Sequence, residues 1–437
     1  MLQMLALPLT LLLMQTPPES SPERRLSLRE ALTLAVQRNL ALARARAEVP
    51  AADAGRRVVR SAVLPRLSAG GNAVRNSTEV SFGPLDDVRA ILPLVDWDLR
   101  LSVSQPIFAG LRDLKAYRQS KIRIDLAREE VRRTSDEVLL STSAQFLFAL
   151  EAEALIDVER RNLELAERRR QQAEDLFQAG ETTRVDVLRA EADIKAAERR
   201  VVEAQRSREV AVSALRVALA LDEDLALVEP AGDERAVPLV PPQQELLNRA
   251  LAARPEVRQA EYSIENARLE VEFQKGAYLP VVTADAGYVR QKRTFPTSSY
   301  GFAALRVNVP IYQGGEVGAR VALAEEREKQ ANLVLDEVRR TVREDIRLAL
   351  VDLEASRTNL ALAEEQLQAA QAEYDQTFEL YQNQELTTLD VQSSETALAD
   401  ARRGVATGRL LVYAAEVKVW YAAGSLTEVA LNQESQP

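Results

Sequence analysis

Residues 106–110 read PIFAG, and residues 310–314 read PIYQG. Residues 178–187 read QAGETTRVDV, and residues 382–391 read QNQELTTLDV. Both matches share one offset of 204 residues (310 − 106), so the same two motifs recur at the same spacing. A repeat of about two hundred residues is too long for a short-period solenoid. The sequence therefore predicts two similar halves that share one architecture.

A third match extends the repeat upstream. Leu64-Pro65 corresponds to Leu279-Pro280 at an offset of 215 residues (280 − 65), so the intervening segment is longer in the first half. We assign residues 23–230 to the first repeat and residues 231–437 to the second.

The spacing of proline predicts long helices in both halves. No proline occurs between Pro106 and Pro230, or between Pro310 and Pro437. Proline inside a helix costs about 3 kcal/mol, so these gaps permit uninterrupted helix. Between Leu111 and Glu229 the only glycine is Gly180, which suits a turn. We expect a helix over 111–179, a turn over 180–183, and a returning helix to about 221. The second helical hairpin is expected over about 316–423.

Each returning helix carries a narrow heptad seam in which large and small residues alternate. The large positions are 187, 194, 201, 208 and 215, and then 391, 398, 405, 412 and 419. The small positions are 190, 197, 204, 211 and 218, and then 394, 401, 408, 415 and 422. Only Arg208 departs from the pattern. Such a seam predicts coiled-coil contact with a neighbouring helix of equal length.

Period-two patterns upstream of each long helix predict strands with one apolar face. They indicate β-hairpins at about 66–105 and 281–309, with loops at 76–96 and 290–299. Segments of about ten residues fit tilted transmembrane strands, although a small soluble β-domain explains the alternation equally well. Four strands cannot close a barrel, and open edges cannot lie in lipid. If the strands are membranous, the chain must oligomerise. Short helices are expected at 27–63 and 245–277.

Composition excludes several classes of function. The net charge is −10, which argues against a nucleic-acid partner. We interpret the arginine runs 168–170 and 199–200 as solvated helix faces. The absence of Cys and His removes thiol nucleophiles, histidine bases and cysteine metal sites. We therefore expect no enzyme activity, no cofactor and no metal. Residues 1–14 are almost wholly apolar, and we interpret residues 1–22 as a signal peptide for export.

The order of these features resembles the TolC-like family of outer-membrane efflux proteins over about residues 26–431. Each half reads helix, Leu-Pro, strand, loop, strand, Pro-Ile-x-x-Gly, long helix, turn with Asp-Val, and long helix. The resemblance implies a mainly α fold with membrane β-strands. It implies a homotrimer whose twelve strands form a barrel in outer-membrane lipid, and whose helices form a tunnel across the periplasm. It also implies a periplasmic adaptor and an inner-membrane pump as partners.

The resemblance further implies a periplasmic gate near the helical turns. Its residues map to Asp390, Tyr381 and Asp186, with Asp186 as the partner of Tyr381. This chain departs from the family pattern at Ser393 and Leu386. The alternative is that both aspartates simply start a helix, where the helix dipole stabilises them. The residues expected to contact the adaptor are those of the two turns: Gly180, Glu181, Thr182 and Thr183, and Gln384, Glu385, Leu386 and Thr387.

Two other classes of protein have long helical hairpins. A periplasmic adaptor normally has one such hairpin within a β-domain, whereas this sequence predicts two. A coiled-coil structural protein would need neither alternating strands nor an internal repeat. The sequence thus favours an outer-membrane channel for efflux or type I secretion, without identifying the transported substrate.

Overall fold

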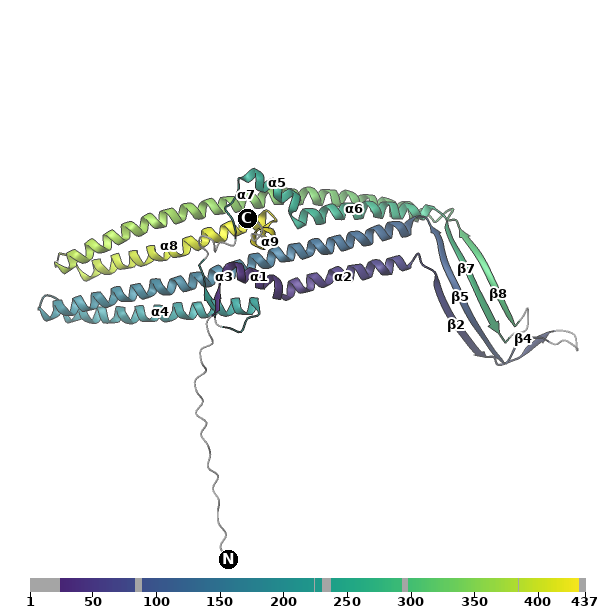
Figure 1. Ribbon diagram of the computed structural model, residues 1–437, viewed down its shortest axis with the longest axis horizontal. Coiled ribbons are helices and arrows are strands. Elements are labelled where there is room, and N and C mark those ends of the chain that lie inside the picture. The colour runs from purple at the N-terminus through teal and green to yellow at the C-terminus, as the bar shows by residue number, and fades with distance from the viewer. Residues whose placement is uncertain are drawn as a thin grey trace, which may run out of the picture.

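The fold is elongated, with helices at one end and strands at the other (Figure 1). It is a computed structural model that describes residues 24–82, 89–223, 225–229, 237–292, 298–383 and 385–431. The predicted signal peptide lies outside these residues. Two long helical hairpins run side by side from the sheet to two adjacent tips (Figure 1).

The long helices follow the proline gaps. In the first hairpin, α3 spans Arg112–Gln178 and α4 spans Arg184–Leu219. In the second, α7 spans Glu316–Gln382 and α8 spans Thr388–Ala422. At about 1.5 Å per residue, the 67 residues of α3 and of α7 each extend roughly 100 Å. Both helices begin directly after a residue with positive φ, Leu111 and Gly315, where the chain turns out of the strand region.

Shorter helices pack along the part of each long helix that its returning helix does not cover. α1 spans Leu28–Arg38, α2 Leu40–Ser61, α5 Gln243–Ala253, α6 Pro255–Lys275 and α9 Leu426–Leu431. On the half nearest the sheet, α2 packs against α3 and α6 packs against α7; on the other half, α4 and α8 take their places (Figure 1). Asn39 separates α1 from α2 because its side chain accepts hydrogen bonds from the backbone N–H groups of Ala41 and Leu42.

The heptad seams lie inside the helical hairpins. All twenty predicted seam positions are buried or half-buried. The small residues let the helices approach closely, since a Cβ added at Gly408 would lie 3.2 Å from the side chain of Leu360 on α7. The exception, Arg208, is half-buried and donates from Nη2 to the backbone oxygen of Leu225 at 3.3 Å. A polar seam position is therefore tolerated where a neighbouring carbonyl satisfies it.

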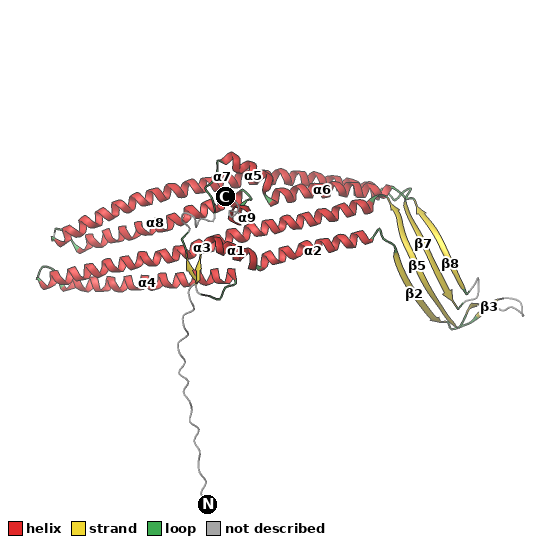
Figure 2. Cartoon of the chain, viewed as in Figure 1, coloured by secondary structure: helices red, strands yellow, loops and turns green. Residues whose placement is uncertain are grey.

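Four antiparallel strands form one sheet in the order β2-β5-β7-β8 (Figure 2). Their bounds are Arg66–Arg75, Val95–Ala109, Val281–Gln291 and Ser299–Asn308. The alternation seen in the sequence places apolar side chains on one face, and many of them are exposed: Leu67, Leu101, Val103, Tyr288, Leu305 and Val307. Within the described chain, the sheet packs no second layer against that apolar face.

The loop predicted over residues 76–96 was partly wrong. It contains a small second sheet in which β3, Val80–Phe82, pairs with β4, Arg89–Leu92, and β5 already begins at Val95. The extra residues of the first half thus form a short ribbon beyond the four-stranded sheet. Residues 293–297 of the other predicted loop lie outside the described residues.

The largest core lies near the middle of the molecule. There β1, Arg24–Leu26, pairs in parallel with β6, Leu225–Leu227, which the sequence pattern did not predict. Phe146, Leu215 and Trp420 from three long helices join this core, each 3% exposed or less. Among the described helices, α3 alone has a stretch long and apolar enough to cross a membrane, and half of that stretch is buried against this chain. Val138, Phe146 and Leu150 of α3 are among the residues that this core buries.

Candidate functional site at the hairpin tips

The turn of the first hairpin begins with glycine at a positive φ. Gly180 has φ +78°, as its position predicted. Its backbone N–H donates to the Phe177 oxygen at 3.0 Å, and the Glu181 N–H donates to the Leu176 oxygen at 2.8 Å. These two bonds form a Schellman motif, which satisfies carbonyls at the end of α3. The side chain of Glu181 is exposed at the tip.

The second turn forms the same long-range backbone bond without a glycine. The Glu385 N–H donates to the Leu380 oxygen at 2.9 Å. Gln384 lies outside the described residues. The side chains of Glu385 and Thr387 are exposed and that of Leu386 is half-buried, so three of the four residues predicted to contact an adaptor are placed at this tip.

Each aspartate is the third helical residue of a capping box at the start of a returning helix, with Thr183 or Thr387 as the N-cap. Thr183 and Thr182 donate from their hydroxyls to Asp186 Oδ2 at 2.7 and 2.9 Å. In the second hairpin, Thr387 donates to Asp390 Oδ2 from its hydroxyl at 2.6 Å and from its backbone N–H at 2.8 Å. These donors lower the pKa of both carboxyls, with the threonine hydroxyls as the main cause. Both aspartates are therefore held as anions near a helix N-terminus.

The three predicted gate residues differ in their surroundings. Asp390 is exposed and Asp186 is half-buried, whereas Tyr381 is 4% exposed and packs with Leu165 and Val391. Its hydroxyl is buried and has no hydrogen-bond partner among the described residues. The hydrogen bonds of Asp186 that the structure describes come from its own turn. A contact between Asp186 and Tyr381 stays a prediction for the assembled protein.

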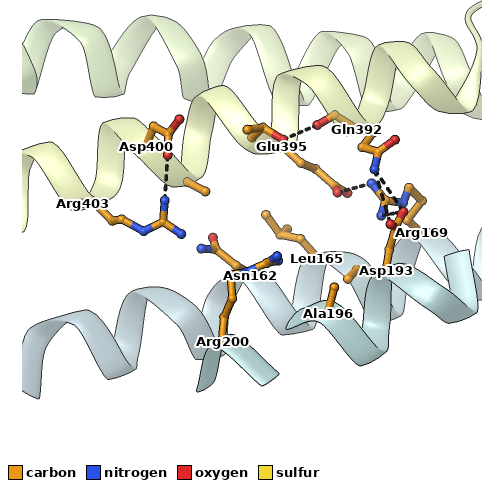
Figure 3. Close-up of a pocket in the computed structure, with 13 residues that line it drawn as sticks. Asn162, Leu165, Arg169, Asp193, Ala196, Arg200, Gln392, Glu395, Asp400 and Arg403 are labelled. Carbon is orange, nitrogen blue, oxygen red and sulfur yellow. Dashed lines mark hydrogen bonds and ion pairs between the residues drawn. The ribbon is translucent and has the colours of Figure 1, made fainter. Parts of the chain in front are cut away.

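A buried ionic cluster joins the two hairpins a few turns from the tips (Figure 3). Arg169 of α3 is 2% exposed; it donates from Nη2 to Asp193 of α4 at 2.6 Å and from Nη1 to Glu395 of α8. The Nε2 of Gln392 on α8 donates to Asp193 at 3.3 Å. We call Arg169, Asp193, Gln392 and Glu395 the interhairpin cluster. It bridges three helices, and through them both hairpins.

The interhairpin cluster and the neighbouring Asn162 have polar atoms that no described protein atom satisfies. Asn162 Oδ1, Arg169 Nε and Glu395 Oε1 are buried without a hydrogen-bond partner among the described residues. All three residues line one cavity of about 320 Å³. A polar cavity of this size can admit water to such groups. Burial raises the pKa of Glu395, the charge of Arg169 opposes that rise, and the nearby Asp193 adds to it.

Two further polar contacts tie α3 to α8 on the sheet side of this cluster. Glu159, 6% exposed, accepts from the Nη2 of Arg403 at 2.6 Å and from the Nε of Arg200 at 3.3 Å. The hydroxyl of Thr407 donates to Glu151 at 2.9 Å. In the distal half of the hairpin pair, these charged and polar contacts add to the buried apolar cluster that contains Leu165, Tyr381 and Val391.

The interpretation of residues 168–170 as a solvated face was wrong for Arg169. A helical period places Arg169 in line with Leu165, Ala166 and Ala173, which form the buried face of α3. Its neighbours Arg168 and Arg170 are exposed and half-buried, as that period requires. Counting the period through the run of arginines would have identified Arg169.

The described residues contain no group of three or more His, Cys, Asp or Glu arranged to hold a metal ion. The hairpin tips carry fixed charged side chains at the end of two long helical hairpins. Such charges can hold two hairpins together or attract ions, and both uses need no covalent step.

Comparisons with known proteins agree with this geometry. A family model described as "Outer membrane efflux protein" matches residues 31–221 and 246–425. The chain is 26% identical over 407 residues to the outer membrane efflux protein BepC of Brucella suis biovar 1 (strain 1330), covering 92% of this chain and 86% of that protein. It is 24% identical over 384 residues to the alkaline protease secretion protein AprF of Pseudomonas aeruginosa, covering 85% and 79%.

The fold has a solved counterpart. The structure of CusC, whose description concerns conformational changes that accompany folding and transmembrane channel formation, superposes with a TM-score of 0.78. Sequence identity is 16%, and the match covers 91% of this chain and 92% of that one. At this identity the likeness establishes the fold.

Proposed function

The chain belongs to the outer membrane efflux protein family, and we propose that three copies of it form the outer-membrane channel of a tripartite efflux or type I secretion system. The family places the protein in the outer membrane, with its helices in the periplasm. BepC is named for efflux and AprF for protease secretion, so relatives of both kinds support the two systems.

The four-stranded sheet is the observation that carries the proposal of an assembly. Its order leaves one edge of β2 and one edge of β8 without a partner in the described chain. Unpaired backbone groups cannot lie in lipid, and membrane barrels need at least about eight strands. Three copies supply twelve strands and remove every edge. The exposed apolar face of the sheet then contacts outer-membrane lipid.

The helical hairpins would form the periplasmic tunnel. At roughly 100 Å, α3 and α7 are long enough to carry a channel far from the membrane. The tips lie at the end of the molecule opposite the sheet (Figure 1), so we assign the contact with a periplasmic adaptor to the turns that follow α3 and α7. The adaptor would in turn connect the channel to an inner-membrane pump.

We place the gate at the same end. Asp390 is exposed at the start of α8, and three copies around one axis would form an acidic ring. Rings of acidic side chains select cations in pores. Asp186 and Tyr381 would act beside it by holding neighbouring hairpins together. The departure at Ser393 leaves this ring with one acid per chain.

Planar-bilayer recording tests the channel function. Protein purified from the outer membrane in detergent should give discrete conductance steps when added to a lipid bilayer. The control is the same preparation after heat denaturation, which should give none. Folded protein that inserts into the bilayer without conductance would contradict the proposal.

A further inference from the structure

The two strand hairpins have the same register. Arg66 lies opposite Ser104 in the first hairpin, and Val281 lies opposite Asn308 in the second. These are equivalent positions of the repeat, since 281 − 66 is 215 and 308 − 104 is 204. The sequence offsets therefore describe the pairing of the strands as well as their order.

One contact inside the chain is a template for a contact between chains. β5 pairs with β7 and joins the two hairpins. In the repeat, β8 is the equivalent of β5, and β2 is the equivalent of β7. Because β8 and β2 are the two edge strands, a second copy of the chain can repeat the same contact.

We infer that β8 of one copy pairs antiparallel with β2 of the next copy in the register of β5 with β7. Ser104 lies opposite Asp285 within the chain, so Asn308 should lie opposite Gly70 between chains. In the same way, Leu101 opposite Tyr288 becomes Leu305 opposite Ala73. This inference rests on the proposed assembly and specifies which residues meet in it.

The pattern of side chains supports this register. It places Leu305 opposite Ala73, Val307 opposite Gly71 and Val309 opposite Ala69, so the apolar faces of the two hairpins stay on one side. A slip of one residue would turn every side chain of one strand to the other face. The possible registers therefore differ by two residues, and the pairing of β5 with β7 selects one of these registers.

The C-terminal end of β8 differs from that of the equivalent strand β5, which has a partner strand. β5 continues to Ala109 because its last residues pair with β7, whereas β8 stops at Asn308. Phe108 is half-buried opposite Val282, but its equivalent Tyr312 is 86% exposed. In the inferred contact, Tyr312 lies opposite Leu67 and Gln313 lies opposite Arg66. Residues 309–313 should thus become strand when a second copy is present.

The glycines that end the two Pro-Ile-x-x-Gly motifs, Gly110 and Gly314, also support this contact between chains. A Cβ added at Gly110 would lie 2.1 Å from the backbone oxygen of Gly276, whereas a Cβ at Gly314 would meet nothing within 4 Å. The equivalent of Gly276 is Ser61, whose oxygen also accepts from the leucine three residues on. Because Ser61 carries a Cβ, the contact between chains must be slightly wider there than the one within the chain.

Disulfide trapping tests the register directly, because the chain has no cysteine of its own. The test variant is Asn308→Cys with Gly70→Cys; a Cβ at Gly70 meets nothing within 4 Å. The control is Asn308→Cys with Asn72→Cys, which lies on the same face of β2 but two residues away. Opposed residues are within disulfide reach and diagonal ones are not. Oxidised membranes should give covalent multimers for the 308–70 pair and monomers for the 308–72 pair.

A second pair of variants tests whether residues 309–313, which follow β8, also pair with β2. Gln313→Cys with Arg66→Cys should also crosslink, whereas Gln313→Cys with Ser68→Cys should not. Light scattering on the same proteins in detergent separates two kinds of failure. If the protein is assembled but only the control pairs crosslink, or none do, the register is wrong and the channel proposal stands. If it is monomeric, the assembly itself is refuted.

Discussion

Asp186 and Asp390 each lie in the first turn of a returning helix. The same threonine and aspartate spacing builds a capping box in both hairpins, so the local structure explains why both residues are there. Only their surroundings differ, since Asp390 is exposed and Asp186 is half-buried. A structural role and a role in the pore are therefore compatible at one residue, and charge must be tested separately from capping.

Asp390→Asn makes that separation, because the amide oxygen can still accept from Thr387 while the charge is lost. We expect lower cation selectivity and weaker block by multivalent cations in single-channel recordings. With one acid per chain, the block in the unmodified protein should itself be modest. Asp186→Asn is the matched control: it should leave selectivity unchanged, and it should raise the open probability if Asp186 holds Tyr381. Unchanged selectivity in Asp390→Asn would show that Asp390 is only a helix-start residue.

The interhairpin cluster is the residue-scale feature that was missed in the sequence. Its members come from α3, α4 and α8, and no local motif connects Arg169 with partners 24 and 226 residues away. The heptad seam predicts which face of a helix is buried, but it does not predict that a charge on that face is paired. Buried charges need such partners, which the fold supplies.

Acid should weaken this cluster. Burial raises the pKa of Glu395 above its ordinary value of 4.5, so Glu395 gains a proton at a higher pH than an exposed carboxyl does. The charged and titratable groups that interact with it are Arg169, Asp193 and Tyr374. Protonation removes the ion pair with Arg169, so the open probability should rise as pH falls towards the raised pKa. The pKa of Asp390 is shifted in the opposite direction, since hydrogen bonds from Thr387 lower it and keep Asp390 charged to lower pH.

Glu395→Gln imitates the protonated state. We expect it to have a raised open probability at neutral pH and little further response to acid, measured in the same bilayer recordings. Glu198→Gln is the control, because Glu198 is a more exposed glutamate whose ion pair among the described residues is with Lys195 on its own helix. A Glu395→Gln channel with the pH response of the unmodified protein would show that the cluster does not hold the closed state.

At the scale of elements, the ends of the long helices could be predicted closely from the sequence. Proline gaps, Gly180 and the heptad seams carry that information locally, and the observed α3 differs from the predicted helix by one residue at each end. The pairing of β1 with β6 could not be predicted, because each strand has three residues and the two are far apart in the chain. The β3–β4 ribbon is short and was assigned to a loop for the same reason.

The first tip turn depends on one backbone conformation. Gly180→Val puts a β-branched residue at φ +78°, with a cost of about 1–2 kcal/mol. We expect weaker coupling to the adaptor, seen as reduced efflux or secretion in a strain that depends on this protein, with normal assembly and insertion. Gly180→Asn should restore much of the activity, since asparagine tolerates this conformation. Full activity of Gly180→Val would remove the assignment of this turn to the adaptor contact.

At the scale of the whole molecule, the four-stranded sheet is open at both edges in the described chain. Among the described residues, no second layer packs on the apolar face of the sheet. In the same part of the chain, residues 309–313, which follow β8, pair with no strand. From the four strands, the sequence predicted that the chain must oligomerise if these strands lie in a membrane. The register that we infer between copies could not be predicted from the sequence, because it is argued from the observed pairing of β5 with β7.

The mass of the purified protein in detergent tests the central claim most directly. Size-exclusion chromatography with multi-angle light scattering separates the mass of the protein from that of bound detergent. The account predicts a protein mass equal to three chains, stable on dilution, because each copy covers the edges of its two neighbours. A well-folded protein with the mass of one chain, soluble without detergent, would contradict it.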